Sequence, residues 1–293
     1  MHKIGVVGVA GGWSTERLAD ATEAMTGFRL LVEMDRVRAD LCTGSVCFED
    51  VDLGDLDAII IKKIGSRYSP GLLDRLEILR YLSARGVRIF SPPLRIMRVI
   101  DRLSCTMTLR LNMIPMPPTT ITEDIETALE IVRTYDRAVF KPLYSSKAKG
   151  MVVVENNREA RGKIERFKKA NSLMYIQKLI NHRGRDLGVT FLGGEYLTTY
   201  ARNNRSSSSW NTTTRSGGAY EACRPDPAII ELARRAQDPF GLDFTCVDIA
   251  ETPEGPVVFE VSAFGGFRGI QTAEGIDVAP LLVEYVIKCL EAE

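Results

Sequence analysis

Two acidic residues near the C-terminus, Asp248 and Glu260, are spaced as if they face each other across a β-hairpin. The flanking runs 244–250 and 256–262 are rich in apolar and β-branched residues, and the turn signal Pro-Glu-Gly around Glu254 separates them. A hairpin centred on Glu254 predicts these pairs: Asp248 with Glu260, Cys246 with Ser262, Val247 with Val261, and Ile249 with Phe259. One face of the hairpin is then apolar, and the other face carries both acids.

Opposed side chains in an antiparallel pair lie roughly 5 Å apart, and like charges at that distance are destabilising unless a cation bridges them. Mg²⁺ prefers one or two carboxylates, with phosphate oxygens and water at its other positions. The pattern therefore predicts that Asp248 and Glu260 bind Mg²⁺. Two solvent-facing acids on an edge hairpin are the alternative, because the register is inferred from the sequence.

A lysine at the end of a buried strand precedes a loop of small residues. Lys141 ends the expected strand 138–141 and opens the loop PLYSSKAKG, which contains Ser145 and Ser146. Small side chains leave backbone N–H groups free to close over phosphate groups, and Lys141 supplies positive charge. We expect a phosphate-binding loop here, with an ordinary basic turn as the alternative.

Two further segments have the composition of a nucleotide site. The strand 173–177 passes into a glycine-containing loop, where the backbone of Lys178 and Leu179 could contact an adenine ring. The stretch 202–218, RNNRSSSSWNTTTRSGG, is rich in hydrogen-bond donors and poor in core-forming residues. It is expected to be either a lid that binds a triphosphate and an anionic substrate or a disordered loop.

Strand and helix patterns alternate along the chain, which indicates an α/β class. Between Pro92 and Asn112 we expect one continuous helix that carries Asp101 and Arg102, followed by the extended linker 114–119. The other expected helices are 15–25 with Ser14 as N-cap, 69–84, 123–134, 158–170 with Asn156 and Asn157 as caps, 226–237 and 278–290. The other expected strands are 3–9, 28–34, 57–62, 87–90, 151–154, 186–192 and 195–202.

The composition is that of an ordinary globular protein. Of 293 residues, 45% are hydrophobic and 26% are charged, and 38 basic residues balance 38 acidic ones, so no basic field indicates nucleic-acid binding. No apolar run is long enough for a membrane span, and a cytoplasmic location is expected. Six cysteines without paired spacing argue against a zinc site, and two histidines argue against His-based triads.

In this order, the pieces resemble the ATP-grasp superfamily and, within it, the RimK-like carboxylate–amine ligases. The motifs that carry the resemblance are DRL at 101–103, IPMPPT at 114–119, VFKPLYSSKAKGM at 139–151, YIQKLI at 175–180, GRD at 184–186, Arg202 with the loop that ends RSGG, CVDIA at 246–250 and FEVSAFGGFRGI at 259–270. The resemblance implies an α/β (α+β) ATP-grasp fold. Residues 1–90 would form a Rossmann-like pre-grasp domain, and residues 91–176 and 177–293 two lobes that clamp ATP.

The resemblance also implies roles for individual residues. The nucleotide would be bound by Arg102, Lys141, Ser145, Ser146, Lys178, Leu179, Asp186, Asn211, Thr212 and Thr213. Magnesium would be held by Asp248, Glu260 and Ser262, while Arg202 and Arg268 would contact the acyl phosphate or the substrate carboxylates. The chain departs from the family pattern at Ser262, which is usually Asn, at Ser145 and Ala148, which are usually Gly, at Lys178, which is usually Glu, and at Gly188, which is usually Arg.

The expected function is an ATP- and Mg²⁺-dependent ligase that joins a carboxylate, through an acyl phosphate, to an amine of an amino acid or peptide. Two Mg²⁺ ions are expected, with Mn²⁺ as a substitute, and the resemblance allows a homo-oligomer. Two alternatives stay open from the sequence. One is a kinase that acts on a small-molecule hydroxyl, and the other is a nucleotide-binding sensor or partner-binding protein that has lost ligase turnover.

Overall fold

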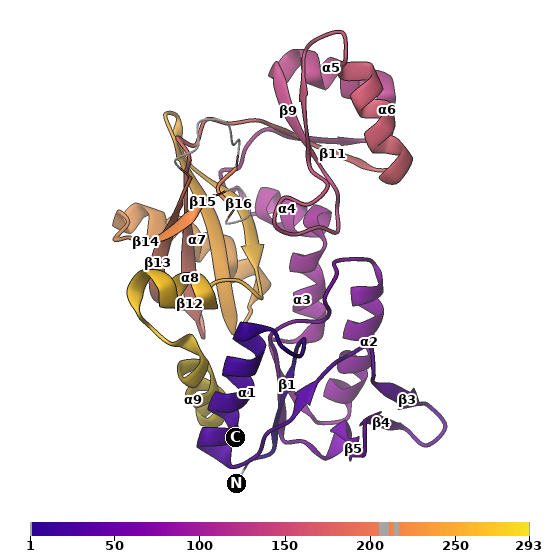
Figure 1. Ribbon diagram of the computed structural model, residues 1–293, viewed down its shortest axis with the longest axis vertical. Coiled ribbons are helices and arrows are strands. Elements are labelled where there is room, and N and C mark those ends of the chain that lie inside the picture. Colours follow the sequence, from indigo (N-terminus) through magenta and orange to yellow (C-terminus); the bar gives the residue numbers. More distant parts are fainter. Residues whose placement is uncertain (1, 205–210, 214–216, 293) are drawn as a thin grey trace.

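The computed structural model describes residues 2–204, 211–213 and 217–292. Three main sheets follow one another along the long axis of the molecule (Figure 1). The sheet built from the N-terminal strands lies at one end, the sheet that contains β9 and β11 lies at the other end, and the sheet that contains β12, β15 and β16 lies between them. The mixed α/β fold that the sequence predicts is confirmed.

The first sheet is parallel, with its strands in the order β2-β1-β6-β7. Its strands are β1 (Ile4–Val7), β2 (Leu31–Val32), β6 (Ala58–Ile61) and β7 (Arg88–Phe90). Every residue of β1 and β6 is buried, as expected for a parallel sheet with helices on both faces. The helices connected to this sheet are α1 (Trp13–Thr26) and α2 (Gly71–Ala84). Gly12, with no side-chain cap, is the N-cap of α1, so the expectation of Ser14 as the cap is wrong.

A small antiparallel sheet lies beside the first one and was not expected from the sequence. It consists of β3 (Arg38–Asp40), β4 (Ser45–Phe48) and β5 (Val51–Asp52), and the short 3-10 turn η1 (Leu53–Asp55) follows it. Val46 and Phe48 of β4 are buried, while all of β3 is exposed. Strands this short, and one of them wholly exposed, leave little periodic signal in the sequence.

The single helix expected from Pro92 to Asn112 is two helices, so that expectation is wrong. They are α3 (Pro93–Ile100) and α4 (Arg102–Leu111), and Asp101 separates them in an extended conformation. The Asp101 side chain accepts a hydrogen bond from the backbone N–H of Leu103 at 3.1 Å, which is the usual way that an aspartate caps a helix. The break makes Arg102 the first residue of α4.

The second sheet is antiparallel, in the order β10-β9-β11-β8. Its strands are β8 (Thr119–Thr122), β9 (Arg137–Lys141), β10 (Val152–Glu155) and β11 (Met174–Lys178), and its helices are α5 (Ile125–Tyr135) and α6 (Ala160–Ala170). The N-cap of α6 is Glu159, without a side-chain cap. Asn156 and Asn157 therefore do not cap α6 as expected; the side chain of Asn157 instead accepts a hydrogen bond from the N–H of Glu159.

The third sheet is antiparallel, in the order β14-β13-β12-β15-β16. Its strands are β12 (Arg185–Leu192), β13 (Glu195–Asn203), β14 (Ala219–Ala222), β15 (Phe244–Thr252) and β16 (Gly255–Ser262). The helix α7 (Pro227–Gln237), followed by the 3-10 turn η3 (Asp238–Phe240), packs against the core side of β15 and β16, and α8 (Phe267–Glu274) packs against β13 and β14.

The acidic hairpin has the expected register up to a β-bulge. Asp248 pairs with Glu260, which confirms the predicted opposition of the two acids. The register shifts directly after Asp248, so Ile249 pairs with Val258, and the predicted pair of Ile249 with Phe259 is wrong. A bulge adds one residue to one strand and increases its local twist, and such bulges are frequent next to functional sites.

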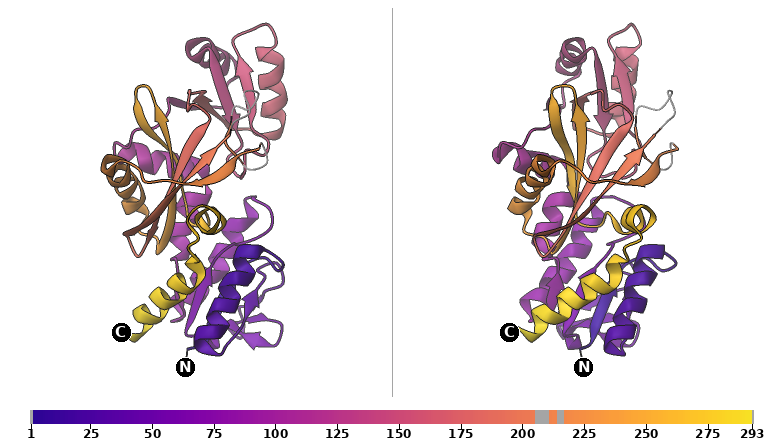
Figure 2. Two further views of the ribbon diagram at one scale, coloured as in Figure 1. Left: turned by 60° about the vertical axis from the view of Figure 1, so that its left-hand side comes forward. Right: turned by 90° about the vertical axis from the view of Figure 1, so that its left-hand side faces the viewer.

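The last helix, α9 (Val278–Glu291), returns to the first sheet and packs beside α1 (Figure 2). Val278, Leu282 and Val286 share a core with Ile4 and Leu18. Both ends of the described chain therefore lie at the same end of the molecule. Over the described residues, no helix is long and apolar enough to cross a membrane.

Candidate active site

A cavity of about 940 Å³ is lined by residues of the second and third sheets and by segments that follow β1 and β6 of the first sheet. Every site residue predicted from the sequence lines this cavity. These residues are Arg102, Lys141, Ser145, Ser146, Lys178, Leu179, Asp186, Arg202, Asn211, Thr212, Thr213, Asp248, Glu260, Ser262 and Arg268. The rest of the expected lid, residues 205–210 and 214–216, lies outside the described residues.

The cavity side of the third sheet carries a row of residues in register across four strands. Glu260 lies opposite Asp248, Asp248 lies opposite Gly188, and Gly188 lies opposite Tyr200. In the next row, Ser262 lies opposite Cys246. The hairpin thus brings two carboxylates and the Ser262 hydroxyl to one patch of the cavity.

Asp248 is the less exposed member of the acid pair, with 16% of its side chain exposed. Burial raises the pKa of Asp248 to about 6, and the nearby carboxylates of Glu260 and Asp186 act in the same direction. The Arg202 guanidinium opposes this shift, because its Nη2 lies 2.9 Å from Oδ2 of Asp248. Glu260 is more open, with 45% of its side chain exposed.

Arg202 holds a second carboxylate as well. Its Nε and Nη2 donate to the two oxygens of Asp186 at 3.0 and 2.6 Å, which is a bidentate pair. Asp186 is buried, so this contact satisfies a carboxylate that would otherwise be costly to bury. The resemblance places Asp186 at the ribose, but both of its oxygens are bound by Arg202 in the structure.

Arg102 connects the acidic hairpin to the predicted phosphate loop, residues 142–150. Its Nε donates to the carbonyl oxygen of Pro142 at 3.1 Å, and its Nη2 lies 3.3 Å from the Ser145 hydroxyl. Its Nη1 lies 3.3 Å from Oε2 of Glu260. Each carboxylate of the acid pair therefore has its own arginine: Arg202 for Asp248 and Arg102 for Glu260.

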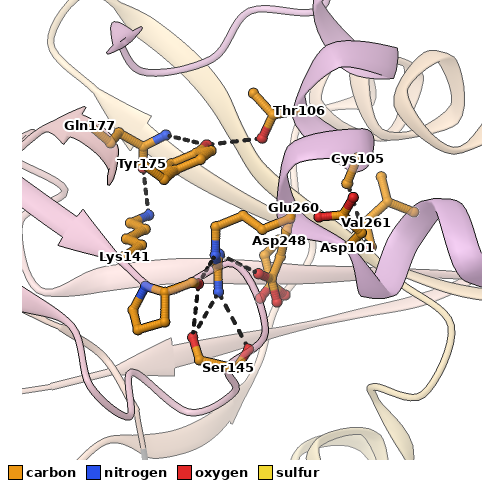
Figure 3. A network of polar contacts seen from close by, with 12 residues as sticks. Asp101, Cys105, Thr106, Lys141, Ser145, Tyr175, Gln177, Asp248, Glu260 and Val261 are labelled. Carbon is orange, nitrogen blue, oxygen red and sulfur yellow. Dashed lines mark hydrogen bonds and ion pairs between the residues drawn. The ribbon is translucent and has the colours of Figure 1, made fainter. Parts of the chain in front are cut away.

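Lys141 is buried and is held by a chain of side chains that runs across the second sheet to α4 (Figure 3). Its Nζ donates to Oε1 of Gln177 at 2.5 Å, the Gln177 amide lies 3.3 Å from the Tyr175 hydroxyl, and that hydroxyl lies 2.9 Å from Thr106 Oγ1. Burial lowers the pKa of Lys141 to about 7. Gln177 was missed by the sequence analysis, although it lies within the YIQKLI motif.

Lys178 and Leu179, which the sequence predicts to contact adenine, use their backbone N–H groups for hydrogen bonds within the protein. The N–H of Lys178 donates to the carbonyl oxygen of Pro118 at 2.8 Å, and the N–H of Leu179 donates to that of Arg137 at 2.9 Å. Ile180 also lines the cavity, and within the described residues its N–H makes no hydrogen bond. An adenine ring at this edge would therefore find its donor at Ile180 rather than at Leu179.

The loop between β9 and β10, which the sequence predicts to bind phosphate, turns through left-handed backbone conformations. Lys147, Ala148 and Gly150 have φ values of 54°, 55° and 73°. Such values are uncommon for residues other than glycine, which explains why the family pattern has glycine where Ala148 stands. The two residues other than glycine hold these conformations at the cost of some backbone strain.

Lys62 is a cavity residue that the sequence analysis missed. It follows β6, and its Nζ donates to the carbonyl oxygens of Phe264 at 2.8 Å and Gly265 at 3.4 Å. The ammonium group also lies 3.7 Å from the ring centroid of Phe267. Burial lowers the pKa of Lys62 to about 7. Nothing in the sequence around this lysine indicates that its side chain reaches a loop 202 residues further along the chain.

The donor set of the hairpin suits magnesium. Two carboxylates and one hydroxyl are hard oxygen donors, and they share one patch of the cavity. No group of three or more His, Cys, Asp or Glu side chains in the described part of the chain could hold a metal ion by itself. The remaining ligands would come from phosphate oxygens and water, as Mg²⁺ in phosphoryl-transfer sites prefers.

Comparison with known proteins agrees with this geometry. Residues 99–286 match the RimK-like ATP-grasp domain. The tetrahydromethanopterin:alpha-L-glutamate ligase of Methanococcus maripaludis is 24% identical over 290 residues, which cover 96% of this chain and 97% of the relative. A probable alpha-L-glutamate ligase of Trichodesmium erythraeum is 27% identical over 284 residues, which cover 95% and 93%.

Solved structures share the fold. The ATP-grasp ligase PsnB, in complex with a minimal precursor, superposes with a TM-score of 0.76 at 17% identity and covers 98% of this chain and 99% of its own. The RimK domain protein ATP-grasp from Sphaerobacter thermophilus gives a TM-score of 0.74 at 19% identity, with 97% and 99% covered. The fold and the resemblance predicted from the sequence are confirmed. Because the matched domain spans more than half of the chain and includes the phosphate loop and the acidic hairpin, the chain belongs to the RimK-like ATP-grasp family of carboxylate–amine ligases.

Proposed function

We propose that this chain uses ATP and Mg²⁺ to activate a carboxylate as an acyl phosphate, which an amine then converts to an amide. The observation that carries the proposal is the pair of opposed carboxylates, Asp248 and Glu260, on the same cavity as the buried Lys141 and the phosphate loop. This arrangement supplies hard oxygen donors for a cation and positive charge for phosphate groups, which phosphoryl transfer needs.

Asp248, Glu260 and Ser262 would hold magnesium, and we propose two ions, with Mn²⁺ able to replace Mg²⁺. When bound, the metal neutralises charge on the phosphate oxygens. The protein's part is to hold these oxygens in place. Before the metal binds, Arg202 and Arg102 balance the two carboxylates, so the site is preorganised without a cation.

The nucleotide phosphates would lie between Lys141, Arg102 and the loop that contains Ser145 and Ser146. Lys141 is held by Gln177, so its ammonium group has a fixed position when the phosphates arrive. The adenine ring would lie against residues 178–180, and Asn211, Thr212 and Thr213 would contact the nucleotide from the segment between β13 and β14. Asp186 would reach the ribose only if Arg202 released one of its oxygens.

The two steps need no covalent protein nucleophile. A carboxylate oxygen of the substrate attacks the γ-phosphorus, the bond to the β–γ bridging oxygen breaks, and ADP leaves. The amine nitrogen then attacks the acyl carbon, phosphate leaves, and the amine loses a proton. Arg202 and Arg268 would neutralise the negative charge that both steps concentrate on oxygen.

The substrates would be an amino acid or a peptide. The two curated relatives described above are named alpha-L-glutamate ligases, and the PsnB structure contains a precursor. The part of the cavity beside the first sheet is lined by Lys62, Lys63 and Arg268. Their positive charges suit a substrate with carboxylate groups.

The test is ADP release from Mg²⁺-ATP, with and without pooled amino acids, small di-acids and peptides. Asp248→Asn should lower the pool-dependent rate by about 100-fold or more, because it removes a charged metal ligand but keeps the shape. Glu251→Gln is the matched control, since Glu251 lies on the same strand but pairs with Arg185 at the surface. Full turnover by Asp248→Asn would refute the proposal. A stable phosphorylated product that forms without an amine, unlike a labile acyl phosphate, would identify a kinase.

A further inference from the structure

Tyr200 occupies a slot on the cavity face of the third sheet that two glycines create. Gly188 lies opposite it on β12, and a Cβ on Gly188 would lie 2.6 Å from the Tyr200 hydroxyl oxygen. A Cβ on Gly269 of α8 would lie 2.8 Å from the ring on the other side. Real Cβ contacts are never this close, so any larger residue at either position would displace the ring. The glycines therefore fix the place of the tyrosine.

The hydroxyl of Tyr200 lacks a strong partner. The residue is 3% exposed, and within the described part of the chain the only hydrogen-bond partner of its hydroxyl is the Cys246 thiol, at 3.5 Å. A thiol is a weak hydrogen-bond partner, whereas buried tyrosine hydroxyls usually find a good one. Burial also raises the pKa of Tyr200 well above its usual range, so the hydroxyl keeps its proton and can donate it to a hydrogen bond.

The position of Tyr200 distinguishes it from the residues that face the phosphate loop. Along the row of the third sheet, one neighbour of Asp248 is Glu260, which pairs with Arg102 on the side of the phosphate loop. Tyr200 lies on the opposite side, two strands away, and its ring crosses Gly188 to reach Cys246 on the strand of Asp248. Arg202, two residues further along β13, faces the same side.

We propose that the Tyr200 hydroxyl binds the substrate carboxylate that ATP phosphorylates, and that Gly188 and Gly269 serve to hold the ring for this contact. The inference rests on the proposed ligase function, because it needs a carboxylate next to Asp248 on the side away from the phosphate loop. Tyr200 is then a substrate-binding residue, and Gly188 is a positioning residue that acts through it. The family pattern has an arginine where Gly188 stands. In this chain the neutral hydroxyl of Tyr200, which lies opposite Gly188, takes the place of that charged donor.

The experiment measures hydroxamate formed from Mg²⁺-ATP, hydroxylamine and a panel of the twenty amino acids and acidic dipeptides. Hydroxylamine takes the place of the unknown amine, so only the acid must be supplied. Tyr200→Phe should lower kcat/KM for the acid by about 10- to 100-fold, the effect of losing one hydrogen bond to a charged group. The KM for ATP should stay within twofold, since the nucleotide contacts lie on the other side of Asp248.

Gly188→Ala should cause a similar loss, because it displaces the ring while keeping the hydroxyl. Adding Tyr200→Phe to Gly188→Ala should then cost little more, since both changes act through one contact. Tyr196→Phe is the matched control: it lies on the same strand, but its hydroxyl bonds to Thr199 away from the cavity. It should keep full activity.

The outcomes separate the inference from the proposed function. Equal kcat/KM for wild type and Tyr200→Phe would overturn the role of Tyr200 and leave the ligase function intact. A Tyr200→Phe variant that loses ATP affinity instead would also overturn it, because the hydroxyl would then serve the nucleotide. If the wild type binds Mg²⁺-ATP but forms no hydroxamate with any acid of the panel, the proposed function fails and the inference fails with it.

Discussion

The Nζ of Lys62 lies 2.8 Å from the carbonyl oxygen of Phe264, which joins the end of a strand in the first sheet to a loop 202 residues further along the chain. That loop follows Ser262 and leads into α8, which carries Arg268. Lys62 thus holds together two cavity walls that come from opposite ends of the sequence. Because its ammonium group is buried on the ring of Phe267, the contact should depend on the charge of the lysine.

Because Lys62 is buried, the free energy of unfolding of the protein should depend on pH. The folded pKa, about 7, lies below the ordinary value of 10.5, so between these values the unfolded chain binds more protons than the folded one. Stability contributed by Lys62 therefore rises with pH across this window, by about 1.4 kcal/mol for each pH unit. The free energy of unfolding of the wild type relative to Lys62→Met should increase from pH 7 to pH 10, as measured by urea unfolding at several pH values.

Lys288→Met is the control for this experiment, because Lys288 is exposed and pairs with Glu284 on α9. The pH dependence measured for Lys288→Met is the background that is subtracted from that of Lys62→Met. A flat difference for Lys62→Met after this subtraction would mean that Lys62 stays protonated and hydrated in the folded protein.

Gln177 should be required for ATP affinity through Lys141. Gln177→Leu removes the oxygen that accepts from Nζ of Lys141, and the buried ammonium group then loses its fixed position. We expect the KM for ATP to rise by about tenfold, with a smaller change in kcat, in the ADP-release assay. Gln237→Leu, at a buried glutamine behind β15, should lower the melting temperature without changing the KM for ATP.

Asp186 should act mainly on Arg202. The Asp186→Asn variant loses the bidentate charged contact, so Arg202 is left with Asp248 as its only carboxylate partner among the described residues. Arg202 then pairs more tightly with Asp248 and competes with metal binding there. The Mg²⁺ concentration for half-maximal ADP release should therefore rise by about tenfold. Asp277→Asn removes a similar pair with Arg17 outside the cavity and should leave the Mg²⁺ requirement unchanged. An unchanged requirement in Asp186→Asn would show that Arg202 does not compete with the metal for Asp248.

The acidic hairpin could be predicted because strand pairing follows two-residue periodicity and a turn signal, which are local properties. The same reasoning failed one residue beyond Asp248, since a bulge changes the register without leaving a mark in the sequence. Asp101 is a similar case: it reads as part of a helix but ends one helix and caps the next. The division into lobes at residues 90 and 176 stays a prediction, although α9 packs on α1 of the first sheet.

Gln177 and Lys62 could not be predicted because their partners are set by tertiary packing. Gln177 becomes visible as the acceptor from the buried Lys141, and Lys62 as a buried lysine whose Nζ donates to the carbonyl oxygen of Phe264. Tyr200 is a different case. Gly188 and Gly269 are far apart in the sequence, and only the structure shows that both pack against the Tyr200 ring.

Removal of magnesium should stop catalysis without unfolding the protein. Asp248 and Glu260 keep Arg202 and Arg102 as counter-charges, so the loss of a cation leaves no unpaired buried carboxylate. We expect EDTA to abolish ADP release and to leave the melting temperature, in the absence of nucleotide, within about 2 °C of its value with Mg²⁺. Arg202→Met should remove this protection, because Asp248 is the more buried acid and would then depend on the metal. Its melting temperature should rise on Mg²⁺ addition by more than that of the wild type, and an equal response of the two proteins would show that the arginines do not substitute for the cation.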